Sequence, residues 1–148
     1  MRIPIVDQQE ILPIDRLKIR RAIRTALRYG GYTNAEISVA LVDDAAIHVV
    51  NRQFLGHDYP TDVISFPLSD SDELLEGELV VSTETAQREA AKVGGDWTPE
   101  CELLLYLIHG TLHLTGFDDH EDEDIAAMRR GESECLKKLG LPYEGYMK

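Results

Sequence analysis

The sequence predicts an α/β (α+β) fold: one domain with a small mixed β-sheet of three to four strands, packed with about five helices. Short runs of alternating apolar residues, typical of strands, lie between longer segments whose apolar residues recur every three or four positions, as in amphipathic helices. Capping residues and glycines separate these segments. The 148 residues contain no linker, repeat or low-complexity stretch, so we expect residues 1–148 to form a single domain with a real core.

The first half of the chain predicts two strands and two helices in alternation. They occupy residues 3–6 (an edge strand), 15–29, 37–42 and 43–56, and a polar loop, 56–62, follows. Asp15 can cap the first helix and Asp43 or Asp44 the second, because a carboxylate accepts hydrogen bonds from the free N–H groups of a first turn. The residues expected on the inner faces of these helices are Leu17, Ile23, Ala26, Leu27, Ile47, Val50 and Phe54.

The middle of the chain predicts two more strands and a helix. A short strand, 63–66, is closed by Pro67, and the acidic stretch 68–76 is expected to be a surface loop or hairpin arm. Residues 78–82 have the clearest strand pattern of this region. Ser82 or Thr83 can cap a third helix that ends at the glycine pair 94–95.

Two helices complete the chain. Thr98 and Pro99 supply a hydroxyl cap and a first-turn proline, and the helix that follows is apolar nearly all round, so it must be covered on several sides. The last helix, residues 123–139, ends before Gly140 and Pro142. Its expected inner residues are Ile125, Met128, Cys135, Leu136 and Leu139.

Composition excludes several classes of protein. Apolar residues make up 43% and charged residues 28% of the chain, as in ordinary soluble domains, and no stretch approaches the roughly 18 apolar residues of a membrane span. The N-terminus lacks the apolar core of a signal peptide. Cys101 and Cys135 show no disulfide framework or CxxC pattern, so we expect free thiols in the cytoplasm.

The net charge of −12 argues against a simple nucleic-acid coat, because phosphate binding normally requires a basic surface. The charge is unevenly distributed, however: residues 1–30 contain seven Lys and Arg against three Asp and Glu. Six of the seven lie in the first helix and predict either a basic patch on an acidic body or an ordinary solvated face. They are Arg16, Lys18, Arg20, Arg21, Arg24 and Arg28.

The segment HGTLHLTGFDDH, residues 109–120, carries the strongest functional signal. On a helix, His109 and His113 lie one turn apart on the same face, where two imidazoles can bind one small cation. Gly116 stands where a helix C-terminal glycine turns the chain back, so the acidic and histidine residues after it return toward the pair. The pattern predicts one Zn2+ per chain; the alternative is a hydrogen-bonded pair of core histidines.

The third ligand is either Asp119 or His120, and spacing from His113 does not choose between them. Three protein ligands leave a position for water, whose pKa the metal lowers toward neutrality, whereas both residues together would close the site around a structural metal. Zinc peptidases with this arrangement place a glutamate general base directly after the first histidine. Here Gly110 stands there, which argues against peptide hydrolysis.

HGTLHLTGFDDH resembles the signature of the YbeY endoribonuclease family, bacterial metal-dependent ribonucleases of ribosomal RNA maturation. The likeness continues in other segments: NRQF at 51–54 with PTDVISFP at 60–67, GELVVS at 77–82, and the last helix from 128 to 141. Order and spacing agree from about residue 37 to 141.

The resemblance implies a zincin-like fold, one Zn2+ and a single-stranded RNA substrate, with roles in processing the 3′ end of small-subunit rRNA and in ribosome quality control. His109 and His113 correspond to two family ligands. The family's third ligand is a histidine six residues after the second, and Asp119 occupies that position. A carboxylate is an ordinary zinc ligand, and counting from Gly116 favours Asp119, whereas a one-residue bulge would bring His120.

A second departure from the family concerns the phosphate. After the aromatic residue of the NRQF block the family usually has an arginine, which is suited to phosphate binding, and this chain has Leu55. Arg52 or His57 could compensate.

The expected mechanism is cleavage of an RNA phosphodiester, with zinc polarising an oxygen or delivering hydroxide. Thr61, Asp62 and Ser65 could line the cleft or simply cap the turn and strand, and no residue is assigned as general base. The ribosome or its small subunit is the expected partner. The alternatives are a ribosome-associated assembly factor with a mainly structural metal and a disfavoured zinc metallopeptidase.

Overall fold

Strands and helices alternate along the first part of the chain, and the computed structural model describes residues 1–70 and 74–142. No helix in these ranges is long and apolar enough to cross a membrane. The elements are β1 (Ile5–Asp7), α1 (Arg16–Tyr29), β2 (Ala35–Val42), α2 (Asp44–Leu55), β3 (Val63–Asp70), β4 (Leu75–Ser82), α3 (Thr83–Val93), α4 (Pro99–Leu114) and α5 (Asp122–Lys138).

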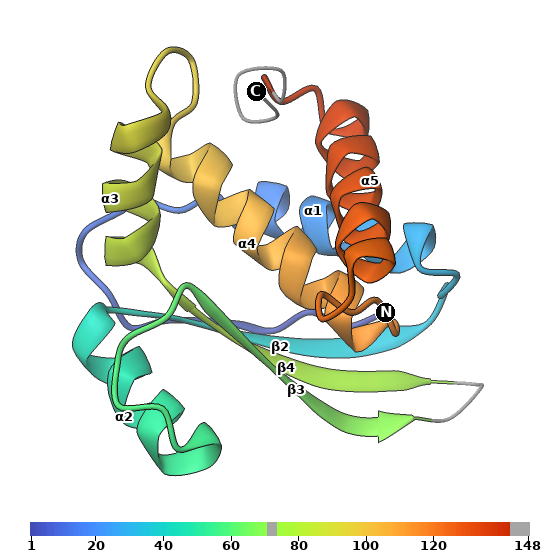
Figure 1. Cartoon of the computed structure of the whole chain (residues 1–148), viewed down its shortest axis with the longest axis horizontal. Coiled ribbons are helices and arrows are strands. Elements are labelled where there is room, and N and C mark those ends of the chain that lie inside the picture. The colour runs from blue at the N-terminus through green and yellow to red at the C-terminus, as the bar shows by residue number, and fades with distance from the viewer. Residues whose placement is uncertain (71–73, 143–148) are drawn as a thin grey trace.

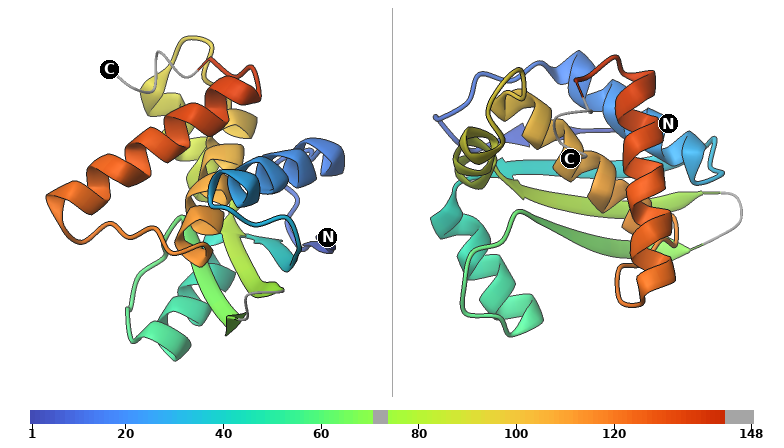
Figure 2. Two further views of the ribbon diagram at one scale, coloured as in Figure 1. Left: turned by 90° about the vertical axis from the view of Figure 1, so that its right-hand side faces the viewer. Right: turned by 45° about the horizontal axis from the view of Figure 1, so that its top comes forward.

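The strands form one mixed sheet in the order β1-β2-β4-β3. The β1–β2 and β2–β4 pairs are parallel, and β3 runs antiparallel to β4 along one edge. Helices α1, α3, α4 and α5 lie on one side of the sheet and α2 lies on the other (Figures 1 and 2). The main core fills the space between the sheet and the four helices, and a small second core lies under α2. The α/β fold with a small mixed sheet and five helices is therefore as expected.

Helix α4 is the centre of the structure, as its apolar sequence predicts: 12 of its 16 residues are buried. It approaches the sheet closely at Gly110, where an added Cβ would lie 2.9 Å from Leu79 Cδ2 and 3.0 Å from Ser65 Oγ. The Ser65 hydroxyl also donates a hydrogen bond of 2.9 Å to the Gly110 carbonyl. The half of α4 that bears the histidines is thus fixed against the edge strand β3.

The prediction that Pro67 ends a strand is wrong. β3 continues to Asp70, with a shift of its pairing to β4 between Pro67 and Ser69. An edge strand accepts a proline because the missing N–H would otherwise face away from the sheet. The acidic stretch 68–76 is accordingly the hairpin arm rather than the loop, with residues 71–73 outside the described part of the chain.

Three residues expected on inner helix faces are exposed: Leu17, Phe54 and, on α5, Ile125, which is 40% exposed. Leu17 is 77% exposed, and Ile19 and Ala22 fill the core in its place. Phe54 is 68% exposed, with its ring centroid 5.7 Å from that of Phe66 at the edge of the second core. Helical periodicity indicates the width of an apolar stripe, but the neighbouring elements decide which of its borders is covered.

Candidate metal centre

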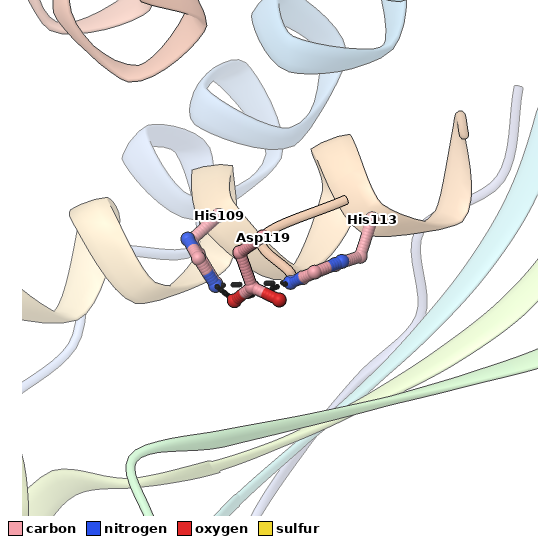
Figure 3. A group of neighbouring side chains, drawn as sticks. All are labelled: His109, His113 and Asp119. Atoms are coloured by element: carbon pink, nitrogen blue, oxygen red, sulfur yellow. Dashed lines mark hydrogen bonds and ion pairs between the residues drawn. The ribbon is translucent and has the colours of Figure 1, made fainter. Parts of the chain in front are cut away.

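The two α4 histidines and one carboxylate after the helix converge on one point (Figure 3). The Nε2 atoms of His109 and His113 are 3.1 Å apart. Asp119 Oδ2 lies 3.4 Å from His113 Nε2 and 3.7 Å from His109 Nε2. Tetrahedral zinc with bonds of about 2.0–2.1 Å places its ligand atoms roughly 3.3 Å apart. The spacing of the three atoms therefore fits a single ion of that size.

The other nitrogen of each imidazole is already engaged. His113 Nδ1 lies 3.0 Å from the Phe117 carbonyl oxygen, which can only accept, so Nδ1 is the donor. His109 Nδ1 lies 2.7 Å from Glu132 Oε2. Neutral rings held in this way present lone pairs at Nε2, and two lone pairs this close repel unless a cation or proton lies between them. The arrangement is that of metal-binding histidines oriented by outer hydrogen bonds.

The electrostatic environment favours positive charge at this point. Burial opposes a charge on His109, but its hydrogen bond with Glu132 and the negative charge of Glu132 outweigh burial and raise its pKa. The charges of Asp62 and Asp119 act in the same direction. A cation bound at Nε2 would be stabilised by the same negative charges of Glu132, Asp62 and Asp119.

The turn after α4 brings Asp119 over the pair, in the way that Gly116 predicts. Gly116 has φ +112, its N–H donates to the His113 carbonyl, and the N–H of Phe117 donates to the Leu112 carbonyl. These two bonds form a Schellman motif, which reverses the chain. The Phe117 ring packs against Tyr29, with centroids 5.8 Å apart, and holds the reversed segment on α1.

His120 does not join the histidine pair. Its side chain is 79% exposed, and Nε2 lies 3.2 Å from Asp118 Oδ1. With Asp118 and Asp119 it forms a second, exposed group, which shares Asp119 with the first. The bulge that would bring it to His109 and His113 is not formed, because the turn at Gly116 fixes the register.

Glu132 is the site residue that the sequence analysis missed. It lies on α5 with its side chain only 4% exposed, in the inner stripe between Met128 and Cys135. A charged residue within an apolar stripe is a recognisable signal, because buried carboxylates are normally paired. Its partner, His109, lies 23 residues away on α4, so the sequence alone did not indicate the pairing.

Two cavities flank the three ligand-type residues. The larger, of about 770 Å³, is lined by residues of α3, α4 and α5 and includes His109, Asp119 and Glu132. The second, of about 470 Å³, lies along β3 and includes both α4 histidines and Asp119. The group of His109, His113 and Asp119 thus borders both cavities.

Polar residues of the PTDVISFP block line the cavities, and two of them, Asp62 and Ser65, also make hydrogen bonds that stabilise the fold. Thr61 and Asp62 line both cavities, and Asp62 Oδ1 also accepts the N–H of Val63 at 2.7 Å. Ser65 lines the second cavity, and its hydroxyl donates a hydrogen bond to the Gly110 carbonyl.

The two residues expected to compensate for Leu55 do not lie at the site. Leu55 lines the second cavity, whereas Arg52 and His57 line neither cavity. The His57 ring instead stacks on Tyr59, with centroids 5.3 Å apart. Arg52 lies within α2 and His57 directly after its C-cap glycine. Helix α2 lies on the other side of the sheet from α4 (Figure 2).

Comparison with known proteins gives a consistent result. A family model described as "Endoribonuclease YbeY" matches residues 4–140. The chain belongs to the YbeY family. Endoribonuclease YbeY of Geobacter sulfurreducens is 40% identical over 152 residues, covering 98% of both chains. The Rhodopirellula baltica enzyme of the same name is 46% identical over 126 residues, covering 85% of this chain and 65% of its own length.

The fold of the chain also resembles that of a solved protein structure. The solution structure of TM1509 from Thermotoga maritima superimposes with a TM-score of 0.64 and 28% sequence identity, covering 93% of this chain and 88% of that one. The family resemblance and the fold class that the sequence analysis predicts are thereby confirmed.

Proposed function

We propose that the chain is a single-strand-specific, zinc-dependent endoribonuclease that acts in the cytoplasm on the 3′ end of small-subunit rRNA and in ribosome quality control. The observation that carries the proposal is the convergence of His109, His113 and Asp119 at atom spacings suited to one zinc ion, with cavities on both sides. Membership of a family of endoribonucleases supports RNA as the substrate.

The chain's own residues would prepare the site for phosphodiester hydrolysis. Bound zinc would supply a Lewis acid and an acidic water. Glu132 and the Phe117 carbonyl fix the orientation of the two imidazoles. Asp62 lines both cavities without belonging to the ligand group, and it would be available there to accept a proton from an attacking water.

The test is cleavage of a labelled single-stranded RNA by the zinc-loaded protein, with the same RNA in a duplex and a peptide as comparison substrates. We expect cleavage of the single strand only, loss on addition of a chelator, and recovery with zinc. His113→Ala should abolish cleavage while the circular dichroism spectrum is unchanged. Failure of the wild type with one bound zinc to cleave any RNA would refute the proposal.

A ribosome-associated assembly factor with a mainly structural metal is the second candidate. It is favoured by one observation: no Lys or Arg is among the described residues that line the second cavity, where Leu55 lies. This candidate predicts binding to small-subunit particles without cleavage of their unprocessed rRNA.

A zinc metallopeptidase remains disfavoured. The close packing of Gly110 against Leu79 and Ser65 leaves no space for the glutamate base that such an enzyme needs at this position.

A further inference from the structure

One face of α4 forms part of the wall of the larger cavity. The residues that it contributes recur at the three- and four-residue spacing that places side chains on one side of a helix. They are Glu102, Leu105, Tyr106 and His109. Glu102 and His109 are two helical turns apart, which is about 10 Å along the helix axis. The cavity therefore extends from the metal centre at His109 to Glu102, a span comparable to that of one nucleotide.

Glu102 is a buried carboxylate that the metal centre does not use. The residue is only 6% exposed, and it belongs to neither group of described residues that could hold a metal ion. Its Oε1 accepts a hydrogen bond of 2.6 Å from Trp97 Nε1. Burial raises the pKa of Tyr106, and the negative charge of Glu102 and a hydrogen bond with it act in the same direction. Among the described residues, the partners of this carboxylate are thus neutral N–H and O–H donors.

A carboxylate in such surroundings can accept hydrogen bonds from a nucleobase. Its two oxygens together accept about four hydrogen bonds, so donors from the ligand can join those from the protein. Proteins that bind single-stranded RNA commonly recognise unpaired bases by their Watson–Crick edges. Guanine presents two adjacent donors there, N1–H and the N2 amino group, and this pair matches the two oxygens of a carboxylate.

The other walls of the larger cavity include apolar side chains. Val93 of α3 and Ile125 and Met128 of α5 line it together with Leu105. Sites for small molecules commonly have volumes of about 300–1,000 Å³, with apolar walls and a few polar groups that fix the orientation of the ligand. The larger cavity, of about 770 Å³, has the size and the apolar surface to hold one base with its polar edge toward Glu102.

We propose that the larger cavity binds an unpaired guanine of the RNA next to the cleaved bond, with Glu102 accepting hydrogen bonds from its Watson–Crick edge. The inference rests on the proposed function and adds a base-specificity residue to it. A purely structural role for Glu102 would require only its hydrogen bond with Trp97 and would predict no preference among bases. Comparison of bases therefore distinguishes the two roles.

The first test is the binding of mononucleotides to the zinc-loaded wild type, because they contain no phosphodiester bond to cleave. Trp97 is the single tryptophan of the chain and donates to Glu102, so its fluorescence reports on this position. We expect guanosine 5′-monophosphate to bind about tenfold more tightly than inosine 5′-monophosphate, which lacks the N2 amino group. The adenosine, cytidine and uridine monophosphates should also bind more weakly than the guanosine compound. Equal affinities for the guanosine and inosine compounds would overturn the inference, whether or not any variant folds.

The second test repeats these titrations with two variants. Glu102→Gln keeps the shape of the side chain and an oxygen for Trp97, but it replaces one acceptor with a donor. Its preference for guanosine over inosine monophosphate should fall to within about twofold, with unchanged zinc content. Glu100→Gln is the matched control, because it lies on the same helix, lines neither cavity and should keep the wild-type preference. A preference that persists in Glu102→Gln, or equal losses in both variants, would overturn the inference.

The third test connects base recognition with cleavage. The zinc-loaded wild type should cleave a short oligouridine that contains one guanosine with a kcat/KM about tenfold higher than the same RNA with inosine at that place. Glu102→Gln should cleave both RNAs at equal rates. Equal cleavage of both RNAs by the wild type would overturn the inference and leave the proposed function intact. If guanosine monophosphate binds with a preference that depends on Glu102 but no RNA is cleaved, only the proposed function fails.

Discussion

Glu132 determines the orientation of the His109 ring, although it is not one of the three residues, His109, His113 and Asp119, that could hold the metal ion. Its oxygen accepts from Nδ1, which leaves Nε2 as the metal-facing atom. The negative charge of the carboxylate also strengthens the imidazole as a ligand.

Glu132→Gln should therefore weaken zinc binding by roughly 10-fold to 100-fold, the usual effect of removing such an outer partner. The glutamine keeps the shape of the side chain but loses the charge. Competition with a chromophoric chelator measures the change. Glu134→Gln, an exposed change on the same helix, should bind zinc as the wild type does. Equal affinities for the two variants would show that His109 needs no carboxylate partner.

The identity of the third ligand can be decided by metal analysis of two variants. Asp119→Ala should lose the single zinc of the wild type, because its oxygen is the third atom of the convergent group. His120→Ala should retain it, since this side chain is 79% exposed and pairs with Asp118. Elemental analysis of the purified proteins gives the result. Zinc weakened in both variants would instead indicate a closed, four-ligand site and favour the assembly factor.

The element that decides the position of the site is α4, and its contact with β3 and β4 depends on Gly110. A larger residue would force its neighbours to shift, because a Cβ would lie 2.9–3.1 Å from side-chain atoms of Leu79, Ser65 and Val63.

Gly110→Ala should lower the free energy of unfolding by about 1–3 kcal/mol, as expected for added volume in a packed core. Alanine's better helix propensity, worth about 1 kcal/mol, offsets only part of this. Urea denaturation measures the change. Leu79→Val shortens the nearest side chain and should recover some stability in the double variant. An undiminished unfolding midpoint for Gly110→Ala would mean that α4 can move away from the sheet at little cost.

A second contact between elements joins α2 to the start of α3. The Asp44 carboxylate accepts hydrogen bonds from the Ser82 and Thr85 hydroxyls, both at 2.6 Å, and from Arg88 at 3.0 Å. Burial tends to raise the pKa of Asp44, but these three hydrogen bonds and the charge of Arg88 outweigh it and lower the pKa.

Because the folded protein binds the Asp44 proton less tightly than the unfolded chain, the carboxylate contributes stability above its ordinary pKa of about 3.8. That contribution is lost as the pH falls through the lower pKa of the folded state. Asp44→Asn should consequently be less stable than the wild type at pH 7, and the difference should shrink below about pH 4. Urea midpoints across this range test it, with the exposed Asp96→Asn as control. A difference that persists at low pH would assign the effect to lost hydrogen-bond geometry instead of charge.

At the scale of the whole molecule, the basic side chains of α1 stand out on a chain of net charge −12. None of these side chains lines either cavity that contains His109. Three of them support the fold: Arg16 donates to the Ile5 carbonyl, Arg20 donates to the Ile3 carbonyl, and Lys18 pairs with Glu100.

The double variant Arg21→Gln with Arg28→Gln should therefore cleave a short RNA within about twofold of the wild-type rate, because neither side chain lines a cavity at the site and salt screens exposed charges. Binding of a long RNA that can reach α1 should weaken, most clearly at low salt. Cleavage rates with short and long RNA at two salt concentrations make the comparison. A tenfold loss with the short RNA would place the bound strand along α1.

Local sequence was sufficient for the elements and for part of the site. The caps Asp15, Asp43, Ser82 and Thr98 act on N–H groups within their own first turns, so the starts of these four helices could be predicted to within one residue. The one-turn spacing of the histidines and the reversal at Gly116 are local for the same reason.

Tertiary packing decided the rest. Whether Leu17 and Phe54 are covered depends on neighbours distant in sequence, and β3 passes Pro67 because it is an edge strand. The carboxylate at His109 comes from α5, whose packing on α4 no periodicity specifies. The sequence by itself thus determined that His109 and His113 share one helix face and that Asp119 or His120 follows the turn, because backbone geometry fixes neighbours within a turn. Only the folded chain decided what surrounds them, because that depends on the packing of separate helices.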